Sequence, residues 1–361
     1  MKEVLEIKNK IKSEIFNKIS EIDEIISITI VGSFIDKDDL SGISDIDVIV
    51  ICDILNKKIF HRCINSFEKL NLDKCGLKNY NLKINSTFGP LKFDKPNTAV
   101  LHLMIYDTKG HKEHVINSPF TCYDWERSND FVGLHLKQIF PVGRIQFRDF
   151  EEARRSTEHY LIDLRINAIS FREYESIDNE LKQVKKNMPM NPKHKGEFAY
   201  HIVKNLISNY IKFCSHKNKL ISKSEIKTFL LNSLNEENRK YHSGKFMLIS
   251  KIKEDRRDNF PEDTTEWAEE FIKEFKTTFF NKWKNAIRIR FFRHFKTSLN
   301  DGSYLGQGRN PSINCKQKIK TKFEEPNVIY SSPLGRCIQS ANIIYNSSNL
   351  IRDDRLLEFN Y

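Results

Sequence analysis

Hydrophobic positions near the start of the chain follow two different periods. Isoleucines recur at steps of three and four through residues 7–22, which predicts an opening amphipathic helix. Short apolar runs bounded by polar or glycine-containing connections then predict buried strands. We place these strands at residues 26–31, 46–52, 82–84 and 100–106. A helix followed by several strands predicts a mixed αβ region, which we extend over residues 1–149.

From about residue 150 the apolar spacing becomes that of long helices. Three stretches carry it, marked by Tyr160, Leu164 and Phe171, by Phe198, Ile202, Leu206 and Tyr210, and by Trp267, Phe271 and Phe275. They predict a helical domain over residues 150–285. A third region, 286–361, opens where Ile287, Ile289 and Phe291 alternate with arginines, which predicts a strand that leads into a polar loop. The expected fold class is α+β.

Composition narrows the class of protein. No segment approaches the roughly 18 apolar residues of a membrane helix, so we expect no membrane span. Seven scattered cysteines form no Cys-x-x-Cys pair, and the first residues alternate charge with isoleucine, so we expect no secretory signal, reduced thiols and a cytoplasmic protein. The net charge of +11 is spread over lysine-rich segments, which is more typical of solvated faces than of a nucleic-acid site.

The first group of residues with candidate chemistry lies at the junction of two predicted strands. Gly32 and Ser33 follow the first strand, and Asp45 and Asp47 begin the second. A glycine there lets backbone N–H groups approach a phosphate, and the serine hydroxyl adds a donor. Asp45 and Asp47 are two residues apart on a strand, so their carboxylates leave on the same face. Mg²⁺ prefers a few carboxylates together with substrate phosphates, so this pattern predicts a metal–triphosphate site.

A Gly-Ser turn followed by Asp-x-Asp between apolar strands resembles the DNA polymerase beta-like nucleotidyltransferase superfamily. The resemblance covers about residues 20–110. It implies that Gly32 and Ser33 bind the phosphates of a nucleoside triphosphate and that Asp45 and Asp47 are catalytic ligands of Mg²⁺.

That family also has a third carboxylate on a later strand, which helps to bind the catalytic metal or takes the acceptor's proton. Three residues of this chain are alternatives for the position: Asp94, Asp107, or His102 in place of an acid. His102 lies within the predicted strand 100–106, where it could act as a base or be a buried core residue. The sequence leaves the choice open.

A second group of residues lies in the last region. Arg293 and His294 follow the strand predicted near residue 287, and a second strand near residue 329 leads to Arg336. An imidazole beside a guanidinium suits nucleophilic attack on a phosphoryl group. Together these residues resemble the histidine phosphatase superfamily, the phosphoglycerate-mutase-like phosphatases.

This resemblance assigns a role to each matching residue. It implies that His294 is the nucleophile, Arg293 and Arg336 clamp the phosphate, Asn300 lies near it, and Glu358 is the proton donor. The second histidine of that family has no counterpart before the chain reaches residue 361. We therefore expect only the front part of such an α/β domain, without phosphatase activity from this chain.

The leading hypothesis from the sequence is a Mg²⁺-dependent nucleotidyltransferase that transfers a nucleotide to a small-molecule acceptor, fused to an incomplete histidine phosphatase module. One alternative is a non-catalytic regulatory protein that binds a nucleotide or phosphate. Another is a transferase that acts on RNA, which the charge of +11 allows but does not favour.

Overall fold

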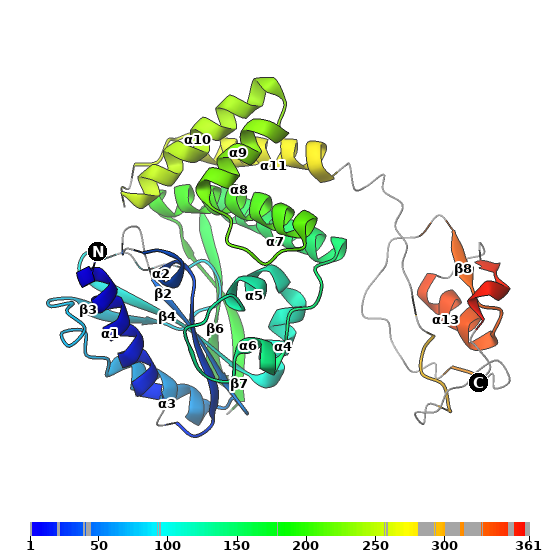
Figure 1. Cartoon of the computed structure of the whole chain (residues 1–361), viewed down its shortest axis with the longest axis horizontal. Coiled ribbons are helices and arrows are strands. Elements are labelled where there is room, and N and C mark those ends of the chain that lie inside the picture. The colour runs from blue at the N-terminus through cyan, green and yellow to red at the C-terminus, as the bar shows by residue number, and fades with distance from the viewer. Residues whose placement is uncertain are drawn as a thin grey trace. The chain divides into compact units, whose positions relative to one another are not determined.

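The computed structural model of the chain is shown in Figure 1. It describes residues 2–19, 22–38, 40, 45–91, 93, 95–178, 180–255, 257, 259–280, 292, 294–299, 311–313, 326, 328–345 and 350–357. These residues belong to two compact units, Met1–Lys284 and Asn285–Tyr361. Helices and strands occur in both units, which confirms the α+β class, whereas the expected boundaries near residues 149 and 285 stay predictions.

A five-stranded mixed sheet forms the first part of the first unit. Its strands are β1 (Ile25–Val31), β2 (Ile46–Cys52), β3 (Asn81–Asn85), β4 (Thr98–Asp107) and β5 (Phe131–Gly133), in the order β3-β4-β2-β1-β5. β1 runs antiparallel to β2 and β5, whereas β4 runs parallel to β2 and β3. Because β1 and β2 are antiparallel neighbours, the end of β1 and the start of β2 meet at one edge of the sheet.

Helices cover both faces of this sheet (Figure 1). On one face, α1 (Lys2–Ile19) and α3 (Lys57–Glu68) bury Ile15 and Phe67 against Ile30 of β1. The other face is covered by α4 (Thr108–Asn117), α5 (Pro119–Trp125) and α6 (Leu136–Ile139). The isoleucine stripe of α1 is buried as its spacing predicts, and the four predicted strands form close to their expected bounds.

The helical part comprises α7 (Phe147–Ile166), α8 (Pro192–Ser215), α9 (Lys223–Ser233), α10 (Glu236–Glu254) and α11 (Thr264–Phe275), followed by the π-helical turn Lys276–Phe280. Trp267, Phe271 and Phe275 have no exposed surface, which confirms that this aromatic stripe is core. Leu91 and Phe120 belong to the same apolar cluster. The helical part therefore packs against α5 and against the loop that follows β3, within one unit.

The expectation that a helical stretch extends to Phe171 is wrong, because a long hairpin forms between α7 and α8 from β6 (Ala168–Ile177) and β7 (Glu180–Pro189). Phe171 continues the helical spacing of Leu164, but Asn167 adopts a left-handed conformation with φ 55° and ends α7. Phe171 therefore lies on a strand. Tyr174 of the hairpin packs on both apolar clusters of the sheet, so tertiary burial decides this segment.

The second unit contains a short βαβ arrangement. β8 (Ile329–Ser331) and β9 (Leu350–Arg352) are parallel, and α13 (Gly335–Tyr345) lies between them in sequence. β8 confirms the strand expected near residue 329. A 3₁₀ turn, Asp354–Leu356, follows. The strand expected at residues 287–291 lies outside the described residues.

Candidate metal and nucleotide site

Gly32 occupies the turn between β1 and the four-residue helix α2 (Ser33–Asp36). Its φ of 78° is a conformation that residues with a side chain rarely adopt. A Cβ atom at this position would lie 2.5 Å from Oδ2 of Asp47, well inside van der Waals contact. The glycine is therefore required both for the turn and for the close approach of the Asp47 carboxylate.

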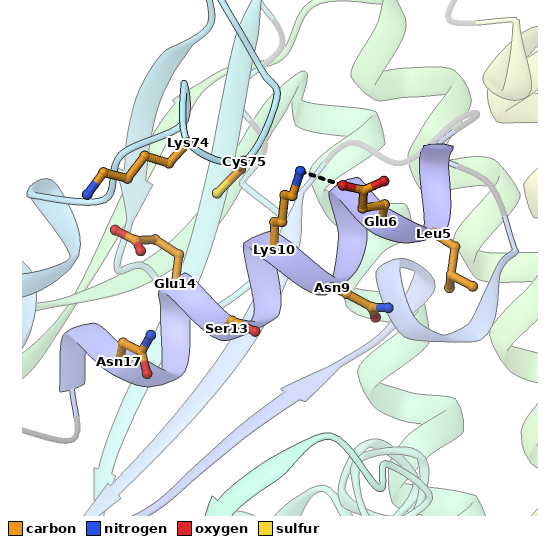
Figure 2. Close-up of a pocket in the computed structure, with 9 residues that line it drawn as sticks. All are labelled: Leu5, Glu6, Asn9, Lys10, Ser13, Glu14, Asn17, Lys74 and Cys75. Atoms are coloured by element: carbon orange, nitrogen blue, oxygen red, sulfur yellow. Dashed lines mark ion pairs between the residues drawn. The ribbon is translucent and has the colours of Figure 1, made fainter. Parts of the chain in front are cut away.

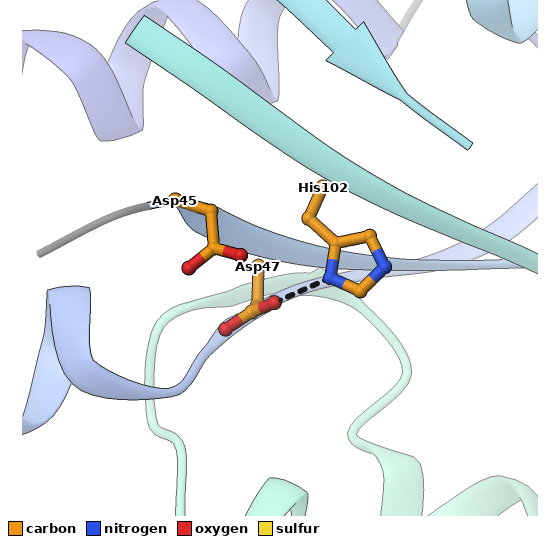
Figure 3. Close-up of side chains that lie close together, drawn as sticks. All are labelled: Asp45, Asp47 and His102. Carbon is orange, nitrogen blue, oxygen red and sulfur yellow. Dashed lines mark hydrogen bonds and ion pairs between the residues drawn. The ribbon is translucent and has the colours of Figure 1, made fainter. Parts of the chain in front are cut away.

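Asp45 and Asp47 lie on the same face at the start of β2, as their spacing predicts (Figure 3). Further along the strand this face carries the buried Ile49. One ligand atom from each aspartate and one from His102 all lie within 4.8 Å of one another. Three donors from two neighbouring strands thus converge beside the Gly32 turn.

His102 belongs to β4 and lies directly opposite Asp47 in the parallel register of β2 and β4. Its Nδ1 is 2.7 Å from Oδ1 of Asp47, and its Nε2 is 2.8 Å from the carbonyl oxygen of Thr87. Only 9% of the residue is exposed. Both ring nitrogens are engaged, so His102 is a buried histidine with satisfied hydrogen bonds, one of them to the carboxylate of Asp47.

The charge state of His102 reflects two opposing effects. Burial disfavours the protonated ring, but the hydrogen bond and the negative charge of Asp47, with the charge of Asp45 and the Thr87 carbonyl, raise the pKa of His102 above its ordinary value. A protonated His102 donates from both nitrogens. It then offsets part of the charge of the two carboxylates.

The structure resolves part of the question of the third acid. Asp107 is five residues beyond His102, opposite Cys52, at the other end of the β2–β4 pairing. Its carboxylate accepts a hydrogen bond of 2.6 Å from the Gly110 N–H and caps α4, so the alternative that placed it at the site is wrong. Asp94 lies outside the described residues. His102 takes the position opposite Asp47.

The helix that carries Ser33 is anchored by ion pairs that the sequence did not reveal. The guanidinium of Arg127 donates to both oxygens of Asp36, at 3.1 and 3.2 Å. Its Nε also donates to Asp124 at 3.4 Å, and Asp124 pairs with the buried Lys212 of α8. α2 is thereby tied to the helical part. These residues are too far apart in sequence for any local pattern to connect them.

Of the second group of residues, those that resemble the histidine phosphatases, the structure describes His294 and Arg336. Nδ1 of His294 lies 2.8 Å from the carbonyl oxygen of Phe295, whose N–H donates to the Ser340 hydroxyl. That hydroxyl donates to the carbonyl oxygen of Arg336, which is fully buried at the start of α13. The His294 segment therefore lies against α13. Arg293, Asn300 and Glu358 lie outside the described residues.

A groove of about 490 Å³ runs along the outer face of α1, as Figure 2 shows. Lys10 and Glu6, four residues apart on α1, line the groove and form an ion pair of 2.6 Å. The loop residues Lys74 and Cys75 line its other side. None of the donor atoms of the Asp45–Asp47–His102 cluster lines it. The groove is thus separate from the candidate site.

Comparison with known proteins gives no assignment: neither the models of protein families nor the curated proteins contain a match to this chain. In the described part of the chain, no helix has the length and apolar character needed to cross a bilayer.

Proposed function

We propose that the site at the start of β2 catalyses transfer of a nucleotide from a nucleoside triphosphate to a small-molecule acceptor, with a divalent cation. The observation that carries this proposal is the convergence of Asp45, Asp47 and His102 donor atoms within 4.8 Å, beside the turn that Gly32 forms. Carboxylates gathered at one point repel one another unless a cation offsets their charge. Mg²⁺, which commonly binds one or two carboxylates together with substrate phosphates, fits the two aspartates.

Each residue of the site would have a separate role in the transfer. Asp45 and Asp47 hold the cation, which when bound offsets the charge that develops on the transferred phosphoryl group. The backbone N–H groups at Gly32 and Ser33 and the Ser33 hydroxyl face the remaining phosphates. Arg127 fixes α2, and with it Ser33, through the bidentate pair with Asp36.

In the transfer itself, an acceptor hydroxyl oxygen attacks the α-phosphorus and pyrophosphate leaves with the electrons of the broken P–O bond. The acceptor proton must reach a base. His102 does not serve in this arrangement, because Asp47 and the Thr87 carbonyl engage both of its nitrogens. Solvent or the leaving pyrophosphate would take the proton.

The second candidate function is nucleotide binding without turnover. It is favoured by one observation, that an imidazole stands opposite Asp47 where the resemblance implies a third carboxylate. A transferase that acts on RNA is a further variant of the first proposal. For residues 286–361 we propose phosphate binding near His294 and Arg336, with no hydrolysis.

The test is nucleotide transfer by the full chain, measured as pyrophosphate release with each nucleoside triphosphate, a divalent cation and a panel of sugar, polyol and RNA acceptors. Asp47→Asn removes one charged ligand, and a loss of about 3 kcal/mol of transition-state stabilisation corresponds to a rate about 100-fold lower. Asp53→Asn, at an exposed position directly after the far end of β2, is the matched control and should leave the rate unchanged.

Three results separate the alternatives. An unchanged rate in Asp47→Asn contradicts the metal role of that residue. Nucleotide binding without pyrophosphate release, across all acceptors, supports the binding protein over the transferase. Release that requires RNA, with binding that weakens steeply as salt rises, identifies RNA as the acceptor.

A further inference from the structure

The donor set of the site differs from the all-oxygen set that suits Mg²⁺. Two of its donors are carboxylates, and the third is the Nδ1 nitrogen of His102. Mg²⁺ is a hard cation that takes oxygen ligands. Imidazole is a ligand of first-row transition-metal ions, whose affinity for a site with nitrogen and oxygen donors rises from Mn²⁺ through Fe²⁺ to Cu²⁺. The nitrogen donor therefore changes which cation the site prefers.

The orientation of His102 is the one that metal-binding histidines usually have. Its Nε2 faces the Thr87 carbonyl oxygen at 2.8 Å, and a carbonyl can only accept, so Nε2 carries a hydrogen. Nδ1 consequently points at the two aspartates. Metal-binding histidines commonly donate their second N–H to such a backbone carbonyl, which fixes the ring and its tautomer.

The residues behind His102 are fixed as well. The Thr87 N–H and hydroxyl both donate to Oδ1 of Asn85, at 3.2 and 2.8 Å. Nδ2 of Asn85 donates in turn to the Leu91 carbonyl at 3.0 Å. Asn85 and Thr87 are 1% and 6% exposed, so this support is shielded from water. A buried chain of hydrogen bonds thus holds the imidazole on the aspartates.

The spacing of the donors fits a single ion. Two ligand atoms at right angles, each about 2.1 Å from one metal, are about 3 Å apart. Oδ1 of Asp47 and Nδ1 of His102 are 2.7 Å apart, and all three donors lie within 4.8 Å. Small side-chain rotations therefore suffice to bring them to one ion, because β2 and β4 are paired directly at these residues.

From these observations we infer that the site binds Mn²⁺ in preference to Mg²⁺, with Nδ1 of His102 and the carboxylates of Asp45 and Asp47 as its protein ligands. Six-coordinate Mn²⁺ accepts a nitrogen ligand and leaves positions for triphosphate oxygens and water, whereas Zn²⁺ usually closes a four-coordinate shell. The inference rests on the proposed function for the role of the ion. The ion itself can be measured without turnover.

The test uses the full chain, stripped of metal by chelation and titrated with Mn²⁺ alone or Mg²⁺ alone. Electron paramagnetic resonance follows the loss of the free Mn²⁺ signal, pulsed measurements detect coupling to a ¹⁴N nucleus, and calorimetry gives both affinities. We expect Mn²⁺ to bind at least 10-fold more tightly than Mg²⁺, with ¹⁴N coupling from His102. The coupling is read on the unaltered protein, so this arm does not depend on the folding of a variant.

The matched variants are His102→Asp, which restores an all-oxygen set, and His61→Asp on the exposed face of α3. We expect His102→Asp to abolish the ¹⁴N coupling and to reduce the preference for Mn²⁺ by about 10- to 100-fold. His61→Asp should change neither. Circular dichroism verifies that both variants are folded.

Two results overturn the inference: bound Mn²⁺ without ¹⁴N coupling, and Mn²⁺ bound no more tightly than Mg²⁺. Failure of the proposed function gives a different outcome. Mn²⁺ with ¹⁴N coupling, but no nucleotide transfer with any cation, upholds the metal site and contradicts the transferase. Transfer with Mg²⁺ from a protein that shows no ¹⁴N coupling upholds the transferase and contradicts the inference.

Discussion

Replacing Gly32 with alanine tests how the β1–α2 turn and the carboxylate cluster depend on each other. A residue with a side chain at φ 78° and ψ −160° is strained by about 1–3 kcal/mol. The new Cβ would also lie 2.5 Å from Oδ2 of Asp47, so that carboxylate must move. Its hydrogen bond to His102 then weakens, and bonds to charged groups contribute about 1.5–3 kcal/mol.

The two effects overlap, because movement of the turn relieves part of the contact with Asp47. We therefore expect Gly32→Ala to lower the free energy of unfolding by about 3 kcal/mol and to weaken Mn²⁺ binding at least 10-fold. Urea titration followed by circular dichroism measures the first quantity, and calorimetry measures the second.

Gly244 provides the matched control for this substitution. It lies within α10, and a Cβ at this position has no neighbour within 4 Å. Gly244→Ala should raise stability by about 0.5–1 kcal/mol, because alanine is the better helix former, and should leave Mn²⁺ binding unchanged. If Gly32→Ala matched the unaltered protein in both stability and metal affinity, the reasoning about this turn would be refuted.

Two further predictions concern residues outside the metal cluster. Arg127→Met removes the two hydrogen bonds to Asp36 that hold α2, so we expect the KM for the nucleoside triphosphate to rise about 10-fold with a smaller change in kcat. Arg155→Met, at an exposed ion pair on α7, should change neither constant. An equal rise in KM in both variants would contradict the positioning role of Arg127. Burial lowers the pKa of His111 and His114 to about 4, so both stay neutral in the folded protein while the unfolded chain takes up protons near pH 6.5. The free energy of unfolding therefore carries no penalty from these two histidines above about pH 6.5 and falls as the pH drops toward 4, by about 3 kcal/mol for His111. Urea titrations at pH 7 and 4.5 should show a smaller loss of stability between the two pH values in His111→Leu than in the unaltered chain. An equal loss would show that His111 titrates normally.

Local periodicity was sufficient to predict much of the sheet and half of the site. The strands β1, β2 and β4 carry short apolar runs bounded by turn residues, which favour buried strands, and the two-residue period of β2 places Asp45 and Asp47 on one face. The turn at Gly32 follows from its place directly after a buried strand. Its contact with Asp47 does not, because that contact depends on how β1 and β2 pair.

The third donor could not be assigned from the sequence, because its position depends on the register between strands that are distant in the chain. His102 and Asp107 lie on the same strand, and only the parallel pairing of β4 with β2 sets His102 opposite Asp47 and Asp107 opposite Cys52. A shift of register would have moved a different residue to the site.

The β6–β7 hairpin and the anchor of α2 were missed for related reasons. Phe171 fits a helical spacing as well as a strand, and the decision depends on the left-handed Asn167 and on the packing of Tyr174 against the sheet. Arg127 and Asp36 are brought together only by the fold. The strand expected near residue 287 falls outside the described residues and stays a prediction.

Anomalous diffraction from crystals of the full chain grown with Mn²⁺ and a non-hydrolysable nucleoside triphosphate would locate the ion. We predict a peak about 2.0–2.3 Å from a carboxylate oxygen of Asp45, from one of Asp47 and from Nδ1 of His102, with triphosphate oxygens beside the Gly32–Ser33 turn. An ion bound elsewhere, with Asp47 still hydrogen-bonded to His102 and the nucleotide away from this turn, would contradict the account.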